Sequence, residues 1–191
     1  VVAPSRNAAL LAAEKIGSDD GPAAAGLAFA YGFRWDRDGV WTRLRPGDIC
    51  PLTGAIYNGP DSRAKLRPGD VLVVDEAGML DQQTAQALLH IADEADARIV
   101  YLGDRHQLPA VGRGGVLDMV AAHSRTALEL SAVHRFLTPD GAKNTTYADL
   151  SLKIRTGVDP EAVFDQLLDQ GHVQLHDTDT DALAALAAES A

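Results

Sequence analysis

The chain has 191 residues, of which 46% are hydrophobic and 23% charged, and its formal net charge is −10. These values are typical of one globular domain or slightly more, and the negative charge argues against a surface coated with basic residues, although a local cationic groove is compatible with it. The lone Cys50 excludes a disulfide framework and a cysteine-based zinc cluster, and it fits a reducing compartment such as the cytoplasm.

The two ends of the chain suggest a fragment of a longer polypeptide. The sequence opens on Val-Val-Ala-Pro without an initiator Met or a signal peptide, and it closes on an Ala-rich run. No stretch approaches the roughly 18–20 apolar residues that span a bilayer, so a membrane is not expected among the partners.

Hydrophobic periodicity, capping residues and turn residues predict alternating strands and helices. In chain order we expect a strand end at 1–3, helices at 6–16 and 22–31, strands at 33–35 and 40–42, a strand at 71–75, a helix at 81–95, a strand at 98–102, a helix at 115–122, a short strand at 128–130, helices at 144–156 and 159–170, a strand at 172–175 and a helix from 179. The alternation between 71 and 122 predicts a parallel sheet, and therefore an α/β fold.

The segment between the second helix and the strand at 71 combines a hairpin with turns. Asp38-Gly39 is a hairpin signal, and Trp35 and Trp41 on either side of it either pin the hairpin, which is the commoner arrangement, or stack on bases. Leu-Arg-Pro-Gly-Asp occurs twice, at 44–48 and 66–70. Pro-Gly suits a type II turn because Gly accepts a positive φ, so we expect two turns that launch extended segments.

The sequence Val71–Met79, VLVVDEAGM, is an apolar run that ends in two adjacent carboxylates, Asp75 and Glu76. The carboxyl end of a buried parallel strand is where open α/β sheets bind ligands. In P-loop ATPases an acid at this edge holds Mg²⁺ and a neighbouring group orients the attacking water. An acidic turn that only solvates the strand end is the alternative. The small residues that follow, Ala77-Gly78, would leave backbone room for a ligand.

A second strand ends in a polar loop at 100–111, VYLGDRHQLPAV. Gly103-Asp104 followed by Gln107 is an arrangement that would place an amide beside a phosphate or the lytic water. A polar loop braced by proline is the alternative interpretation. His106 is interpreted as loop surface.

These segments, together with LSAVHRF at 130–136, resemble motifs II, III and IV of superfamily 1 DNA helicases. More narrowly, they resemble the RecD-like helicase region of MobF-type conjugative relaxases, the TraA/TrwC-like nickase-helicases. The opening VVAPSRNAALLAAEKIG resembles motif Ia of the same enzymes, and YADLSLKIR at 147–155 resembles the run after motif IV. The resemblance covers roughly residues 1–175.

The resemblance implies ATP and Mg²⁺ as cofactors and roles for individual residues. Asp75 would bind Mg²⁺, and Glu76 would act as the base that activates water. Gln107 would contact the γ-phosphate. Arg135 would act as an arginine-finger-like contact on the same phosphate, a role that suits its bidentate fork.

The resemblance also implies single-stranded DNA as a partner, with other conjugation proteins as further partners. The motif Ia residues Pro4, Ser5 and Arg6 would lie along the DNA backbone. For Arg6, a plain exposed residue at a helix start is the alternative.

The chain departs from this family in two respects: no G-x-x-x-x-G-K-[ST] loop occurs in it, and the late motifs near the nucleotide face of the second RecA-like domain are not found before Ala191. In the family this loop lies shortly before motif Ia, which would place it upstream of Val1. We therefore expect an incomplete RecA-like P-loop NTPase sheet with flanking helices, lacking the P-loop strand and carrying a hairpin insertion at 33–68. The isolated fragment is expected to bind ATP weakly and not to hydrolyse it.

The predicted domain organisation is a partial motor domain at 1–135 and a helical segment at 136–191. The predicted function is the ATP-dependent DNA helicase of a conjugative relaxase, in which ATP hydrolysis drives unwinding during plasmid transfer. Two alternatives remain open at this point: a RecD-like helicase or exonuclease subunit, and a non-hydrolysing module that only binds DNA or a partner.

Overall fold

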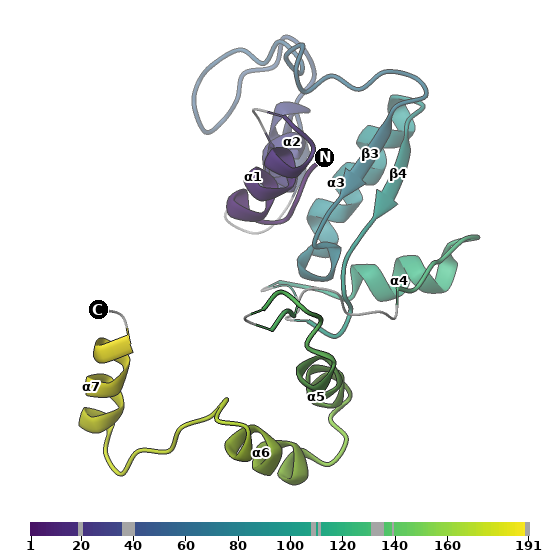
Figure 1. Ribbon diagram of the computed structural model, residues 1–191. Coiled ribbons are helices and arrows are strands. Elements are labelled where there is room, and N and C mark those ends of the chain that lie inside the picture. Colours follow the sequence, from purple (N-terminus) through teal and green to yellow (C-terminus); the bar gives the residue numbers. More distant parts are fainter. Residues whose placement is uncertain are drawn as a thin grey trace. The chain divides into compact units, whose positions relative to one another are not determined.

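A computed structural model describes residues 1–18, 21–35, 41–107, 110, 112–130, 136–138 and 140–189 (Figure 1). The chain divides into two compact units, Val1–Leu128 and Glu129–Ala191, each of which is described by itself. The predicted domain limits at 135 and the insertion at 33–68 stay predictions.

The first unit alternates helices with short strands, as an α/β fold requires. Its elements are α1 (Arg6–Lys15), α2 (Ala24–Ala30), β1 (Phe33–Trp35), β2 (Trp41–Arg43), β3 (Val71–Val74), the 3₁₀ turn η1 (Ala77–Met79), α3 (Gln82–Glu94), β4 (Arg98–Tyr101) and α4 (Val116–His123). The helices and strands predicted between residues 1 and 122 are thus present, with ends shifted by one or two residues.

The sheet of this unit is parallel, as the alternation of strands and helices predicts. β3 pairs with β4 in a register that places Val71 opposite Arg98 and Val74 opposite Tyr101. On the other side of β3, the Val2 amide donates to the Val73 carbonyl at 2.8 Å and the Val2 carbonyl accepts from the Asp75 amide at 2.9 Å. The predicted strand end at 1–3 is therefore a third parallel segment of the sheet.

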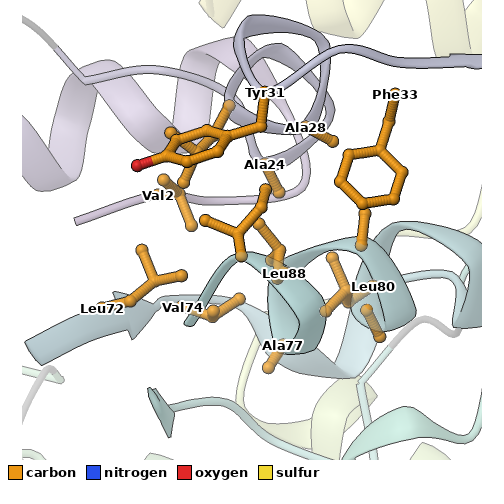
Figure 2. Packing of buried hydrophobic residues seen from close by; sticks show 14 of the residues in the cluster. Val2, Ala24, Ala28, Tyr31, Phe33, Leu72, Val74, Ala77, Leu80 and Leu88 are labelled. Carbon is orange, nitrogen blue, oxygen red and sulfur yellow. The ribbon is translucent and has the colours of Figure 1, made fainter. Parts of the chain in front are cut away.

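The core lies between β3, α2 and α3. Leu88 and Ile91 of α3 are fully buried, because the apolar residues of this helix recur at helical spacing and share one face, and Leu80 just before the helix is 1% exposed. Figure 2 shows the small side chains Ala24 and Ala28 of α2 above this layer. Their size lets α2 approach α3 closely, which explains why an Ala-rich helix suits this position.

β1 and β2 form an antiparallel pair in which Trp35 is opposite Trp41. The predicted hairpin is therefore present, although its turn at 36–40 and the side chains of both tryptophans lie outside the described part of the chain. The choice between pinning and base stacking stays open.

Both Leu-Arg-Pro-Gly-Asp segments form the type II turns that their sequence predicts. Gly47 and Gly69 have φ of 99° and 85°, and the following Asp48 and Asp70 donate their amides to the arginine carbonyls three residues earlier, at 2.9 and 3.0 Å. Each aspartate carboxylate also accepts the arginine amide, at 2.6 and 2.8 Å. The second turn leads directly into β3.

The second unit contains α5 (Thr145–Thr156), α6 (Pro160–Asp169) and α7 (Asp179–Glu189). Tyr147 of α5 packs edge-on against Phe136 and His172, with ring centroids 4.7 and 4.6 Å apart. The three helices agree with the sequence prediction.

Two predicted strands are wrong. Residues 128–130 and 172–175 are not strands, and both Leu128 and Leu130 are 90% exposed. A strand is stable only where a neighbouring strand satisfies its backbone groups, and neither segment has such a neighbour among the described residues.

Within the described ranges, no helix is long and apolar enough to cross a membrane.

Candidate functional site

Three chain segments reach the same edge of the parallel sheet. Since Val2, β3 and β4 run in one direction, the residues after each of them meet at the carboxyl end of the sheet. These residues are the predicted site segments 4–6, 75–76 and 103–107. The carboxyl edge of a parallel sheet is the usual ligand site of open α/β folds.

Asp75, the predicted Mg²⁺ ligand, follows β3 directly and is half-buried. Its Oδ1 accepts the Glu76 amide at 2.9 Å, which orients the carboxylate. A carboxylate has about four acceptor positions, so this bond leaves capacity for a cation. No group of three His, Cys, Asp or Glu side chains that could hold a metal occurs among the described residues. Mg²⁺ commonly takes one or two protein carboxylates and completes its shell with water and phosphate, and the acceptor positions left on Asp75 suit such a role, which stays a prediction.

Glu76, the predicted general base, is half-buried and has a left-handed backbone, with φ 54° and ψ 36°. This conformation costs a non-glycine residue about 1–2 kcal/mol. It arises because the chain turns sharply after β3, so that the Ala77 amide can donate to the Leu102 carbonyl at 2.8 Å. Strained backbone of this kind is common at functional sites, where the surrounding structure maintains it.

The space beside Gly78 is filled by protein backbone. A Cβ on Gly78 would lie 2.6 Å from the carbonyl oxygen of Asp104. The expectation that Ala77-Gly78 leaves room for a ligand is therefore wrong, because the turn after β4 packs into that room. The glycine is needed for contact between two loops.

Gln107, the predicted γ-phosphate contact, lies in an exposed turn after β4. The Gln107 amide donates to the Asp104 carbonyl at 3.3 Å, and the Asp104 carboxylate accepts the His106 amide at 2.9 Å. Leu108, Pro109 and Val111 lie outside the described residues. The turn places Gln107 at the same sheet edge as Asp75, while its contact with phosphate stays a prediction.

The glycine-rich segment 112–115 packs on the first turn of α3. Its carbonyls at Arg113 and Gly114 accept the Gln82 amide and side-chain nitrogen, both at 2.8 Å. Asp81 caps the same helix by accepting the Thr84 amide at 2.9 Å, as its position predicts. Because the Arg113 and Gly114 carbonyls point toward α3, these hydrogen bonds fix the start of the helix to the segment that follows β4.

The predicted DNA-contact residues lie at the start of α1. Ser5 caps this helix, its hydroxyl accepting the Ala8 amide at 3.2 Å, and Ser5 and Arg6 are exposed. The cap accounts for one role of Ser5 and leaves its predicted DNA contact untested. Arg135 lies outside the described residues, so its predicted role also stays a prediction.

Tyr101 ends β4 just before this edge. Burial raises the pKa of its phenol to about 12, and its hydroxyl is the one buried side-chain polar atom without a hydrogen-bond partner found in the described part. The phenol is neutral at ordinary pH, and burial of its hydroxyl without a partner has a cost in free energy.

Comparison with known proteins finds a matching family and a similar protein. The AAA domain family matches residues 1–178 of the chain. The RecBCD enzyme subunit RecD of Mycolicibacterium smegmatis is 41% identical over 97 residues, which are 50% of this chain. The matched stretch is 16% of that relative, so the chain spans only a small part of its length.

Proposed function

The chain belongs to the AAA domain family, and we propose that it is part of the motor of an ATP-dependent DNA helicase of the RecD-like superfamily 1 class. One observation carries the proposal: three parallel segments bring Pro4–Arg6, Asp75–Glu76 and Gly103–Gln107 to one sheet edge. The order of these segments along the chain is that of helicase motifs Ia, II and III.

The proposal gives each of the site residues predicted from the sequence a distinct role. Asp75 holds Mg²⁺, and Glu76 accepts a proton from the attacking water, which needs a carboxylate fixed in direction. Gln107 contacts the γ-phosphate from the exposed turn after β4, and Arg135 contributes positive charge to the same group. Bound ATP would supply the free energy that drives movement along DNA.

We further propose that a phosphate-binding loop and its strand precede Val1 in the full-length protein. Among the described residues β4 pairs only with β3, and Val100 of β4 and Leu102 directly after it are 41% and 49% exposed. Parallel strands are usually buried on both faces, so a further strand beside β4 would cover apolar surface. The motif resemblance supports the loop, since it lies upstream of motif Ia in that family.

The finer proposal is that this motor is attached to a conjugative relaxase and acts with single-stranded DNA and other conjugation proteins. Its support is the narrower resemblance of VLVVDEAGM and LSAVHRF to MobF-type nickase-helicases. A second candidate is a RecD-like subunit of a helicase or exonuclease, which the similarity to the mycobacterial RecD favours. A nicking domain with clustered His and Tyr in the same polypeptide would favour the relaxase.

The test of the motor proposal is Glu76→Gln in a longer chain that includes the residues preceding Val1. We expect DNA-stimulated ATP hydrolysis to fall by about 10²–10⁴-fold, since the amide cannot accept the proton, while ATP binding is retained. Glu14→Gln, which removes an exposed carboxylate from α1, is the matched control and should hydrolyse ATP normally. Equal hydrolysis by the Glu76 variant and the parent would contradict the role of Glu76.

A further inference from the structure

Gly103 allows the loop after β4 to lie directly on the loop after β3. A Cβ on Gly103 would be 2.8 Å from the Ala77 nitrogen and 3.0 Å from the Gly78 nitrogen. Both neighbours are backbone atoms, which cannot move aside as a flexible side chain could. Any residue other than glycine at position 103 would therefore push the two loops apart.

Gly78 makes the reciprocal contact. A Cβ there would lie 2.6 Å from the Asp104 carbonyl oxygen, which also accepts the Gln107 amide. Neither Gly78 nor Gly103 has a positive φ, so the requirement for glycine comes from close approach rather than from backbone conformation. We call the apposition of Gly78 and Gly103 the glycine contact.

The glycine contact lies next to the strained residue of the site. Glu76 immediately precedes the Ala77 amide that bonds to Leu102, and its own carbonyl carbon would be 3.4 Å from a Cβ on Gly103. The left-handed backbone of Glu76 is thus held on one side by β3 and on the other by the loop that carries Gln107. A displacement of that loop must move the backbone of Glu76.

We propose that Gly78 and Gly103 are positioning residues that hold Glu76 in its left-handed conformation and transmit movement of the 103–107 loop to it. The loop that would contact the γ-phosphate and the carboxylate that would activate water then move as one unit. The catalytic part of this inference rests on the proposed function, whereas the loop contact can be tested without it.

The first test is nuclear magnetic resonance of the 191-residue chain. In the parent protein we expect NOEs between the Hα atoms of Gly78 and Gly103 and slow exchange of the Ala77 amide. Gly103→Ala should speed that exchange at least tenfold and shift the Glu76 resonances. Gly26→Ala is the matched control, because a Cβ on exposed Gly26 of α2 meets nothing within 4 Å.

Absence of the NOEs in the parent, or unchanged Ala77 exchange in folded Gly103→Ala, would overturn the inference. If Gly103→Ala does not fold, the inference is decided by the NOEs in the parent and by Ala77 amide exchange in Gly78→Ala compared with the parent.

The second test separates positioning from folding by steady-state kinetics in the longer chain. Gly103→Ala should lower kcat for ATP by about 100-fold, the effect of misplacing a catalytic group by about 1 Å, with KM for ATP changed less than threefold. Gly26→Ala should leave both constants unchanged. An unchanged kcat in folded Gly103→Ala would overturn the positioning role. If the parent longer chain hydrolyses no ATP, the proposed function fails, while the NOE and exchange measurements still decide the loop contact.

Discussion

Glu76 has a backbone conformation that suits glycine, yet its carboxylate is the group for which we propose a catalytic role. The structure therefore predicts a conflict between stability and function at this residue. Glu76→Gly and Glu76→Ala both remove the carboxylate, but only glycine adopts a left-handed backbone without strain. We expect the glycine variant to be more stable than the alanine variant by about 1 kcal/mol in urea unfolding, the reverse of the order at ordinary positions.

Asp96 provides the matched control for this comparison. It is exposed, follows α3 and has φ 50°, but it lies at the opposite end of β4 from the candidate site. Asp96→Gly should likewise be more stable than Asp96→Ala, without any effect on hydrolysis. If alanine were more stable than glycine at position 76 but not at 96, Glu76 would not be left-handed in solution.

At the scale of single residues, the sequence predicts interactions that span three or four positions. The capping roles of Ser5 and Asp81 and the turns at Gly47 and Gly69 follow from local chemistry, and all are present. The contact of Gly78 with the loop after β4 joins residues 25 positions apart and has no local pattern. Such a contact requires the sheet register to be known first.

The β1–β2 hairpin is attached to α3 by a bidentate ion pair. Arg43 donates to both carboxylate oxygens of Glu94, at 2.7 and 2.8 Å, and its guanidinium lies 4.4 Å from the centroid of the Phe33 ring. Both side chains are partly exposed, so the coupling is modest. A double-mutant cycle with Arg43→Met and Glu94→Gln should give a coupling energy of about 0.5–1 kcal/mol at pH 7.

The coupling between Arg43 and Glu94 should depend on pH in a defined direction. The hydrogen bonds from Arg43 hold the pKa of Glu94 below its ordinary value of 4.5. Because the pKa of Glu94 is lower in the folded than in the unfolded chain, the carboxylate stabilises the fold at any pH above its unfolded pKa. This stabilisation is lost as the pH falls through the lower pKa of the folded state. The exposed pair Arg105–Asp118, 3.8 Å apart, is the control and should show almost no coupling. Equal coupling energies in the two pairs would contradict the attachment of the hairpin to α3. A coupling energy between Arg43 and Glu94 that does not decrease at low pH would contradict it as well.

Whole elements are predictable where the sequence contains their local signals. The helix α3 has an N-cap and a continuous apolar face, and the run VLVV before Asp75 has the composition of a strand, so both elements are present. Residues 128–130 and 172–175 have strand-like composition but are not strands. Composition does not reveal whether a pairing partner is within reach, which is why these two predictions fail.

For the molecule as a whole, our proposal makes the sheet edge at Asp75 one half of a nucleotide site. Asp75, the strained Glu76 and the turn that carries Gln107 lie at one edge of the parallel sheet, whereas no phosphate-binding loop occurs in the 191 residues. The sequence alone shows that these residues contain no phosphate-binding loop, because that loop has a fixed pattern. How closely the loops after β3 and β4 pack together is evident only from the structure.

DNA-stimulated ATP hydrolysis, measured side by side in the 191-residue chain and in a longer chain that includes the residues before Val1, tests this central claim most directly. We predict hydrolysis by the longer chain and none by the shorter one, because backbone amides and a lysine of the phosphate loop supply the main anchor for ATP. Hydrolysis by the 191 residues alone would contradict the account.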